Sequence, residues 1–377
     1  MRRGMFLSAA LAAGFILSTA VSVAGPKTVQ GPGADPQCFK PWSDKIKYFQ
    51  WEKKPGPYRI AIVNGFVGNT WRIQMIKTAK AFAEQPEIKS HVKEFKVVST
   101  GTDVAAQLGA IEDFINQGYD AIVTIAVSPE GFDRVIRLAD KNNVVIVPFD
   151  NVLDTDKVME VNEDQLELGR MNGRFLRQQL GDKTEGKILE VRGLPGNSVD
   201  RDRHIGFREV MEKAPNKFNI TEVVGNWDTG TSQKVTADAL AVHGHFDGVF
   251  TQGGSDGTVQ AMMDAKHPFV AMSGEGENEY RKQIADHSKD GLKGMSYGQS
   301  PALVAIAMKA AISALQGNAM PQLISIPIPV ATYKDLKPGE NYWPELKANF
   351  FADNQFKPCG VDFTAPQIMA QSEKNTQ

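Results

Sequence analysis

The sequence predicts an α/β protein with two doubly wound lobes, each a parallel β-sheet covered by helices on both faces. Two observations predict this class. Short apolar runs alternate with amphipathic helical patterns between residues 58 and 315, and the alternation falls into two successive sets. The length of 377 residues, 42% of them hydrophobic, agrees with two domains, since a domain usually holds about 100–200 residues.

The individual elements follow in order along the two sets. In the first set we expect strands at 58–63, 95–98, 121–125 and 144–148, and helices near 69–84, 104–117 and 132–142. In the second we expect strands at 187–191, 220–224, 248–251, 269–272 and 292–296, and helices near 201–213, 232–241 and 256–265. Ligands of such sheets bind at the carboxyl ends of strands, so two facing lobes predict a cleft there.

The first 24 residues have the pattern of an export signal. Arg2 and Arg3 supply positive charge, residues 6–23 are mostly apolar, and Ser22 and Ala24 are the small residues that precede a cleavage site. The alternative is a membrane anchor, which needs about 20 apolar residues, whereas small polar residues interrupt this run. We therefore expect cleavage near Ala24 and an exported product that is not embedded in a membrane.

Charge and cysteine content exclude several classes of function. The net charge is −2 and no basic block is present, so a nucleic-acid-binding surface is not expected. Two cysteines are too few for a disulfide scaffold or a thiolate metal cluster. In an oxidising compartment we expect Cys38 and Cys359 to form a disulfide that ties the N-terminal lead-in to the C-terminal tail, with two free thiols as the alternative.

Polar and aromatic side chains gather directly after the expected strands. Asn, Asp, Glu, Gln and Arg each contact two neighbouring hydroxyl groups, and a Trp face suits the C–H face of a sugar ring. The alternative is that the polar residues cap helices and turns, and that Trp71 and Trp227 pack in a core. The stretches are 64–72, 148–151, 193–203, 226–228, 252–256, 274–277 and 297–301.

Four stretches together resemble the periplasmic sugar-binding proteins of ABC importers, the type I group that is similar to ribose-binding protein. The likeness covers about residues 58–330. The stretches are Asn69-Thr70-Trp71-Arg72, Val147-Pro148-Phe149-Asp150, the run from Gly196 to Phe207, and Gln299-Ser300-Pro301.

The resemblance implies a hinge of three chain crossings, near residues 162, 298 and 329. The aromatic residues of the segments outside the two lobes are expected to pack on the lobes: Trp42, Trp51, Tyr342 and Trp343. The implied division is a signal peptide at 1–24, a lead-in at 25–57, an N-terminal lobe at 58–161 plus 299–328, a C-terminal lobe at 162–298 plus 329–345, and a tail at 346–377.

The resemblance also implies a set of residues that bind a sugar. Asn69 would bond hydroxyl groups, Trp71 and Trp227 would stack on the ring from opposite lobes, and Asp150 and Arg201 would be the principal charged partners. The whole set is Asn69, Trp71, Arg72, Asp150, Asn151, Arg201, Trp227, Ser255, Asp256, Glu275 and Gln299.

Several positions depart from the pattern of this group. Arg72 stands where a second aromatic residue is usual, and Glu275 where an Asp is usual. Ser255 and Asp256 are assigned to an Asn-Asp pair, with two extra residues before them. Gln299 resembles the polar residue at a hinge crossing. These differences favour a different pentose, a hexose or a linear polyol over ribose itself.

The implied function is capture of a monosaccharide or sugar alcohol by hinge closure in the periplasm, with delivery to the permease and ATPase subunits of an ABC transporter. We expect a monomer that needs no cofactor or metal. The alternative is a periplasmic sensor that presents its ligand to a chemoreceptor or sensor kinase. A transcription regulator of the same fold is disfavoured, because its N-terminal helix-turn-helix would fall where the export signal lies.

Enzyme motifs do not support a catalytic function. Gly294 to Gly298 match the G-x-S-x-G pattern around Ser296, but all six histidines precede this serine, so the order of a hydrolase triad is impossible. His243 and His245 lack a nearby third metal ligand, and a Walker A sequence is absent. We therefore expect no catalytic residue.

Overall fold

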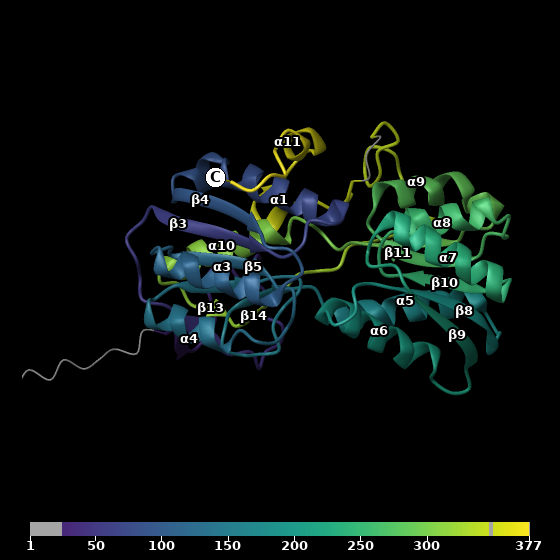
Figure 1. The fold of residues 1–377 in the computed structure, drawn as a ribbon, viewed down its shortest axis with the longest axis horizontal. Coiled ribbons are helices and arrows are strands. Elements are labelled where there is room, and N and C mark those ends of the chain that lie inside the picture. The colour runs from purple at the N-terminus through teal and green to yellow at the C-terminus, as the bar shows by residue number, and fades with distance from the viewer. Residues whose placement is uncertain (1–24, 347–349, 377) are drawn as a thin grey trace, which may run out of the picture.

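The structure is a computed structural model that describes residues 25–346 and 350–376. The expected export signal at 1–24 lies outside the described residues. Two α/β lobes lie side by side along the long axis and are joined by several crossings of the chain (Figure 1). The predicted fold class, two lobes with parallel sheets, is confirmed. Among these residues no helix is long and apolar enough to cross a membrane.

The N-terminal lobe is built on a four-stranded parallel sheet in the order β4-β3-β5-β6. Its buried apolar residues form one cluster on each face of the sheet. The strands are β3 (Tyr58–Asn64), β4 (Val92–Ser99), β5 (Ala121–Ile125) and β6 (Val145–Pro148), and the helices are α1 (Thr70–Ala83), α2 (Pro86–Lys89), α3 (Val104–Asn116), α4 (Asp133–Lys141) and α10 (Leu303–Leu315).

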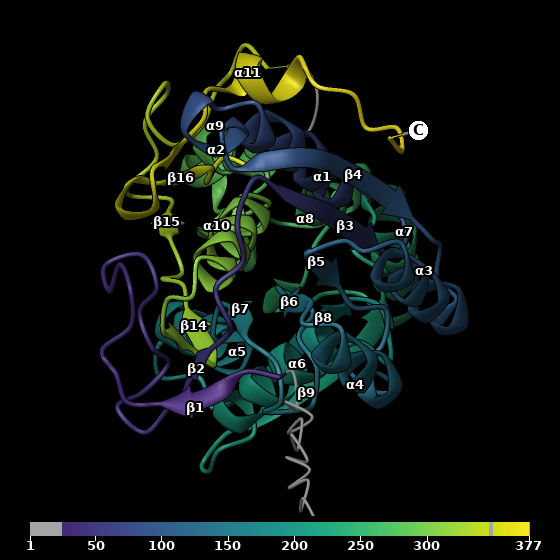
Figure 2. The same cartoon turned by 90° about the vertical axis from the view of Figure 1, so that its left-hand side faces the viewer.

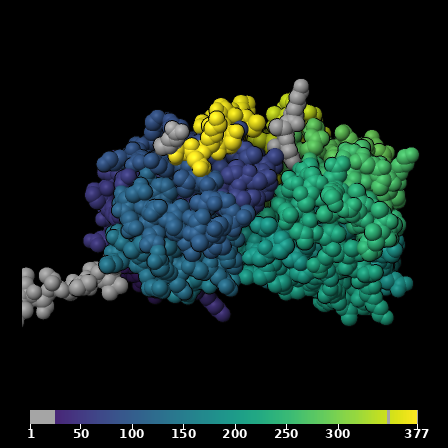
Figure 3. All heavy atoms as spheres, in the orientation of Figure 1, coloured from purple at the N-terminus to yellow at the C-terminus, as the bar shows by residue number. Residues whose placement is uncertain are grey.

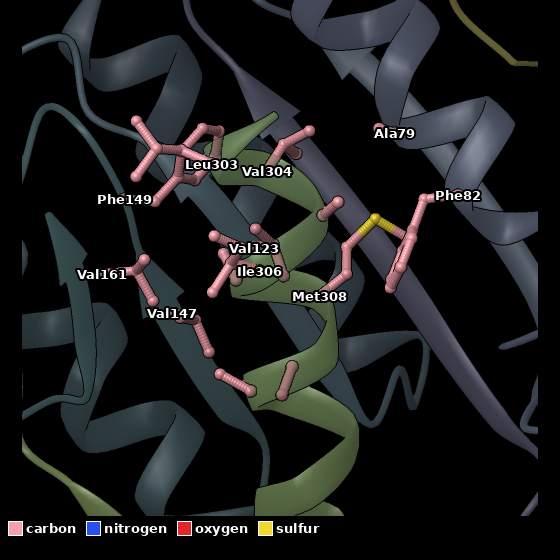
Figure 4. Packing of buried hydrophobic residues seen from close by; sticks show 14 of the residues in the cluster. Ala79, Phe82, Val123, Val147, Phe149, Val161, Leu303, Val304, Ile306 and Met308 are labelled. Carbon is pink, nitrogen blue, oxygen red and sulfur yellow. The ribbon is translucent and has the colours of Figure 1, made fainter. Parts of the chain in front are cut away.

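Helix α10 is the central helix of this lobe, although it lies more than 150 residues after the sheet it covers. Nearly all its residues are buried, because it is apolar on every face and packs between the sheet and α1. Figure 4 shows Leu303 and Ile306 beside Phe149 and Val123 of the sheet side, and Met308 beside Phe82 of α1.

Small sheets extend this lobe. Strand β7 (Glu160–Asn162) pairs in parallel with β14 (Leu323–Ser325). The lead-in contributes β1 (Lys27–Val29) and β2 (Tyr48–Gln50), which pair antiparallel with each other, and β2 also pairs with β13 (Met320–Pro321). Trp51 of the lead-in is buried in the core of this lobe, as expected.

The C-terminal lobe has a six-stranded sheet in the order β15-β12-β11-β10-β8-β9, parallel except for β15. Its strands are β8 (Glu185–Arg192), β9 (Lys217–Val224), β10 (Gly248–Thr251), β11 (Ala271–Glu275), β12 (Gly294–Tyr297) and β15 (Val330–Thr332). Its helices are α5 (Gln165–Leu180), α6 (Ser198–Met211), α7 (Thr229–His243), α8 (Ser255–Asp264) and α9 (Asn278–His287), followed by the short helix η1 (Ser288–Asp290).

Helices α5 and α6 pack unusually closely because glycines line their contact. A Cβ atom on Gly169 would lie 2.2 Å from the carbonyl oxygen of Arg203, and one on Gly206 would lie 2.0 Å from that of Leu166. No side chain fits between the two backbones at these points. The close contact holds the first half of α6 in place, and this segment carries part of the candidate site.

The chain passes between the lobes at three places before the tail begins. It leaves the N-terminal lobe between β7 and α5, returns between β12 and α10, and leaves again between β14 and β15. The tail then divides between the lobes. Tyr333 and Leu336 pack against the C-terminal lobe, whereas Phe356, Phe363 and Ile368 are buried in the core of the N-terminal lobe.

The last part of the tail covers the N-terminal lobe. It forms β16 (Gln355–Phe356), η2 (Lys357–Cys359), β17 (Val361–Asp362) and α11 (Ala365–Met369), and α11 lies above α1 and β4 in Figure 2. In the space-filling view it lies on the N-terminal lobe next to the junction with the other lobe (Figure 3). The expected disulfide between Cys38 and Cys359 is confirmed and joins the tail to the lead-in.

Candidate ligand-binding site

A pocket with a cavity of about 30 Å³ lies between the lobes at the hinge. Its lining residues follow the carboxyl ends of strands or begin helices, as expected for a doubly wound sheet. The N-terminal lobe supplies Asn69, Trp71, Arg72, Asp150 and Asn151, the C-terminal lobe supplies Val199, Arg203, Trp227 and Glu275, and the hinge crossing supplies Gln299.

The start of α1 places three of these residues. The side chain of Asn69 caps the helix by accepting a hydrogen bond from the backbone N–H of Arg72 at 2.9 Å. The indole Nε1 of Trp71 donates to the carbonyl oxygen of Gln299 at 2.7 Å, which links the helix to the hinge. The guanidinium of Arg72 donates to Asn64 at 2.8 Å and lies over the ring of Phe66.

Arg72 remains a cation at neutral pH although it is buried. Burial lowers its pKa to about 10, and the nearby carboxyl group of Asp150 opposes this shift. A guanidinium donates several hydrogen bonds in one plane, so this residue supplies directed donors where an aromatic residue would supply only a flat face.

Asp150 lies directly after β6 and faces the two buried guanidinium groups of the pocket. Its backbone adopts a left-handed conformation with a φ of 59°, which is uncommon for a residue other than glycine. Burial raises its pKa to about 7, while Arg72 and Arg203 lower it and Glu275 raises it. Its Oδ1 atom is buried and has no hydrogen-bond partner among the described residues.

Arg203 of α6 is completely buried and connects four segments of the chain. Its guanidinium donates to Gln165 at 2.9 Å, to the carbonyl oxygen of Gln252 at 2.8 Å, to Glu275 at 2.6 Å and to Gln299 at 2.7 Å. Burial raises the pKa of Glu275, and Arg203 opposes that shift. This network fixes the polar wall of the pocket on the C-terminal lobe.

Trp227 is held against the pocket by an unusual backbone and by two glycines. Asn226 and Trp227 have φ values of 55° and 56°, so the chain turns sharply and projects the indole. A Cβ atom on Gly193 would lie 2.1 Å from the indole, and one on Gly253 would lie 2.9 Å from it. The indole Nε1 has no hydrogen-bond partner within the described chain.

The structure brings together eight of the eleven residues that the sequence suggested. Three lie elsewhere: Arg201, Ser255 and Asp256. The eight that line the pocket are Asn69, Trp71, Arg72, Asp150, Asn151, Trp227, Glu275 and Gln299.

The guanidinium that α6 brings to the pocket belongs to Arg203 and not to Arg201. The side chain of Arg201 is 44% exposed and donates to Asp154 of the other lobe at 2.9 and 3.2 Å and to Asp202 at 2.7 Å. Residues two positions apart on a helix point about 200° apart, so only one of the two arginines faces the pocket. The expectation for Arg201 is corrected accordingly.

Ser255 and Asp256 support the site from behind instead of lining it. The hydroxyl of Ser255 accepts a hydrogen bond from the backbone N–H of Glu275 at 3.1 Å, and the side chain of Asp256 accepts one from Thr229 at 2.9 Å. The carboxylate of Glu277 accepts hydrogen bonds from the first backbone N–H groups of α8. These groups are therefore satisfied within the protein.

Arg203 and Val199 were missed by the sequence reasoning for different reasons. Arg203 lies in the run from Gly196 to Phe207 that contributes to the resemblance, and the helical period of this run could have identified it. Val199 gave no signal, because an aliphatic residue carries no polar pattern. It lies one turn before Arg203 on the same face of α6 and forms an apolar wall of the pocket.

One group of side chains elsewhere approaches the spacing of a metal site within the described chain. Potential ligand atoms of Glu190, His204 and Glu222 lie within 4.8 Å of one another on the C-terminal lobe. The guanidinium of Arg208 donates to Glu190 at 2.9 Å and also to Glu222. The guanidinium of Arg208 is thus already bound between the carboxylates, and the cluster is a partly buried ion-pair network.

Two hinged α/β lobes with a polar pocket between them define a class of proteins that bind small ligands, and the sequence agrees with the structure. Residues 60–319 match the periplasmic binding protein domain, and the chain belongs to this family. The resemblance to the periplasmic sugar-binding proteins is thereby confirmed.

Two curated proteins and one solved structure illustrate the likeness. Over 255 residues the chain is 24% identical to a ribose import binding protein of Bacillus subtilis, covering 66% of this chain and 81% of that protein. It is 24% identical over 204 residues to a xylitol-binding protein of Mycolicibacterium smegmatis, covering 53% of this chain and 55% of that protein. The periplasmic component of an arabinose ABC transporter from Shewanella sp. ANA-3, bound to L-arabinofuranose, has the same fold, with a TM-score of 0.65, 24% identity, and coverage of 73% of this chain and 92% of that one.

Proposed function

We propose that this protein is the solute-binding component of an ABC importer and captures a monosaccharide or sugar alcohol between its two lobes. One observation carries the proposal. Three buried polar atoms of the pocket residues have no hydrogen-bond partner among the described residues: Oδ1 of Asp150, Nε1 of Trp227 and Nε2 of Gln299. An unpaired buried polar group costs about 1–3 kcal/mol, so a ligand that pairs all three is strongly favoured.

The chemistry of the three atoms matches a polyhydroxylated ligand. Asp150 offers an acceptor, whereas the indole and the amide offer donors, and a hydroxyl group serves as either partner. The three come from different lobes and from the hinge, so one small molecule with several hydroxyl groups would engage all of them. The faces of Trp71 and Trp227 complement the C–H surface of a sugar.

The balance of charge in the pocket favours a neutral ligand. Arg72 and Arg203 provide two positive charges, and Asp150 and Glu275 provide two acidic groups opposite them. An anionic or cationic ligand would add a net charge to this balanced and buried set, which is costly. The set of partners suits hydroxyl groups, which require no net charge.

The size of the pocket restricts the ligand to a small molecule. The cavity of about 30 Å³ has room for about one or two water molecules, so a sugar has to be small and needs the lobes to move apart as it enters. Ribose and xylitol are named as ligands of two relatives, and arabinofuranose is bound in a solved structure of the same fold. We therefore place a pentose, a five-membered sugar ring or a short polyol first among the candidates.

The proposed mechanism is capture by closure of the lobes. Ligand contacts from both lobes stabilise the closed form, and its population rises by the differential affinity of the ligand for the two forms. The closed complex then delivers its ligand in the periplasm to a membrane permease that an ATPase drives. The protein itself leaves the ligand chemically unchanged.

A thermal-shift screen tests this function. The purified protein is heated with D-ribose, L-arabinose, D-galactose, xylitol or erythritol, and with L-amino acids and phosphate as controls. We expect one or more of the sugars or polyols to raise the melting temperature in a saturable way. Chromatography of the ligand after incubation should recover it unaltered. Stabilisation by the amino acids or phosphate alone, or conversion of a sugar, would overturn the proposal.

A further inference from the structure

Five residues of the tail form a second kind of link between the lobes. We call residues 350–354 the strap. On the C-terminal lobe, the backbone N–H of Asn278 donates to the carbonyl oxygen of Phe350 at 2.6 Å, and the N–H of Ala352 donates to that of Gly276 at 2.8 Å. Glu277 and Phe351 form an antiparallel β-bridge between these two bonds. The strap is therefore paired by backbone to the segment that follows β11.

The same strap is bound to the N-terminal lobe by the buried side chain of Gln74, and its Phe350 and Phe351 pack in the buried apolar cluster of that lobe. The amide of Gln74 on α1 donates to the carbonyl oxygen of Phe351 at 3.1 Å and to the side chain of Asn354 at 2.8 Å. Its oxygen accepts a hydrogen bond from the backbone N–H of Phe351 at 2.8 Å. Gln74 and Asn354 are both buried, so water does not compete for these bonds.

Asp353 connects the strap to the hinge itself. Its carboxylate forms an ion pair with Arg281 of α9, whose side chain is only 1% exposed, and its carbonyl oxygen accepts a hydrogen bond from Ser300. A Cβ atom on Gly276 or on Gly298 would lie 3.0 Å from the same carboxylate. These two glycines directly neighbour Glu275 and Gln299 of the pocket, so the strap contacts the backbone that positions both.

Both ends of the strap are fixed to different lobes. Before it, the backbone N–H of Trp343 donates to the side chain of Asn278 on the C-terminal lobe at 2.7 Å. After it, the disulfide of Cys359 with Cys38 joins the tail to the lead-in of the N-terminal lobe. The tail passes from the region of α9 to that of α11 in Figure 1. The strap and the rest of the tail lie beyond residue 319, where the match to the family ends.

We propose that the strap is a fourth hinge connection, which limits how far the lobes separate and positions Glu275 and Gln299 for the ligand. The strap contacts both lobes and the hinge crossing at 298–302. It therefore opposes bending and twisting of the lobes about the other three chain crossings. Ligand affinity depends on the fraction of the free protein that is close to the ligand-binding conformation. A restricted opening raises this fraction and therefore raises affinity. The positioning role rests on the proposed function, whereas the restriction of opening does not.

Lobe separation in the protein without ligand tests the restriction directly. Spin labels are attached to cysteines introduced at Lys141 of α4 and at Val242 of α7, both exposed and on different lobes. The labelling is done without reductant, so that the native disulfide stays closed. Pulsed electron paramagnetic resonance then gives the distribution of distances between the lobes.

The variants weaken the attachment of the strap to one lobe at a time. Asp353→Ala removes the ion pair to the C-terminal lobe, and Gln74→Ala removes the bonds to the N-terminal lobe. Asp362→Ala is the matched control, because Asp362 is an exposed acid of the same tail. We expect longer and broader distance distributions for the first two variants and an unchanged one for the control. If Asp353→Ala does not fold, the distance distributions of Gln74→Ala and Asp353→Asn decide whether the strap limits lobe separation.

Ligand binding supplies the second measurement, with the sugar that gives the largest thermal shift as the probe. We expect Asp353→Ala and Gln74→Ala to weaken binding about fivefold or more, and Asp353→Glu to restore part of it. Distance distributions that match those of the parent protein in both strap variants would overturn the proposal. If no sugar binds the parent protein, the proposed function fails, while the distances still decide whether the strap restrains the lobes.

Discussion

The acidic and basic side chains of the pocket set its response to pH. Asp150 lies between Arg72 and Arg203 and close to Glu275, and its pKa of about 7 results from burial that these two cations only partly offset. Glu163 of the hinge crossing is buried nearby, and burial raises its pKa well above the ordinary value. Asp150 is thus half protonated near neutral pH, where most carboxyl groups are fully ionised.

We expect ligand affinity to rise with pH through the range around 7. Ionised Asp150 accepts hydroxyl hydrogen bonds on both oxygens, so binding favours the ionised form and loses up to about tenfold per pH unit below 7. Titration calorimetry between pH 5.5 and 8.5 with the best ligand measures this slope. Asp150→Asn should bind more weakly with no slope near pH 7. An equal slope in parent and variant would assign the titration to another group.

The two arginines of α6 should behave differently when each is replaced by lysine. Arg203→Lys removes the fork of donors that reaches Glu275 and Gln299, and it leaves buried acceptors unpaired. We expect about a hundredfold or greater loss of affinity and a lower melting temperature. Arg201→Lys should change affinity less than about fivefold. Calorimetry with the same sugar compares them, and equal losses would contradict the assignment of Arg203.

At the scale of single residues the sequence predicts the kind of site better than its exact members. The ends of the expected strands predicted Asp150, Trp227 and Glu275 for the site. Residues that follow a parallel strand lie at the edge of the sheet where ligands bind. Arg201 came from the resemblance, whereas the helix brings Arg203 to the pocket, because residues two positions apart on α6 point to nearly opposite sides.

At the scale of elements, the first turns of α6 make contact with the opposite lobe as well as with the pocket. On one face Val199 and Arg203 line the site, and on another Arg201 forms a bidentate ion pair with Asp154, which lies in the loop after β6. The hydroxyl of Ser198 also donates to the carbonyl oxygen of Val152 in that loop, at 3.3 Å. These contacts join the lobes at the edge of the site.

We expect the pair between Arg201 and Asp154 to favour the closed form by a small amount that salt removes. Exposed ion pairs contribute about 0.2–1 kcal/mol, so Asp154→Asn should weaken ligand binding by about fivefold at most. In 1 M NaCl the parent and variant should agree, because screening removes the interaction. Asp156→Asn is the control, since Asp156 pairs with Lys47 of its own lobe. A difference in ligand binding between parent and variant that salt does not change would contradict an ion-pair contribution from Arg201 and Asp154.

Two long helices, α5 and α10, were not predicted, for a physical reason. Helix α5 contains Gly169 and Gly173, which lower helix propensity but permit the close contact with α6. Helix α10 lacks an amphipathic period because it is buried on every face. Both depend on contacts with distant parts of the chain, and a pattern within one segment does not contain that information. Strands β5 and β6, which are buried runs of apolar residues, needed no such context.

At the scale of the whole molecule, the tail and the lead-in add two links to the two lobes, namely the disulfide and the strap. The disulfide closes a loop of 321 residues that contains both lobes. The resemblance anticipated three crossings, and the described tail adds the strap as a further one. The tail sequence alone does not predict this contact, because the partners of its backbone groups, of Asp353 and of Asn354 lie far away in the chain, at Gln74 and Arg281 among others.

Breaking the disulfide should lower stability without abolishing the fold. A covalent link across so long a loop reduces the freedom of the unfolded chain, which corresponds to about 2–5 kcal/mol. The double variant Cys38→Ser with Cys359→Ser should unfold at lower urea concentration than the oxidised parent. The reduced parent should behave like the variant. Coincident unfolding curves for all three would show that the bridge adds no stability.

The late position of α10 in the chain has a consequence for how the protein is made. Until residues 303–315 have been synthesised, Val123, Val147 and Phe149 have no helix to cover them, and the first half of the chain presents an uncovered apolar face. The middle of the chain supplies nearly all of the other lobe. The half that is translated first is therefore the half completed last, and a nascent polypeptide cut short before residue 303 would be a target for chaperones and proteases.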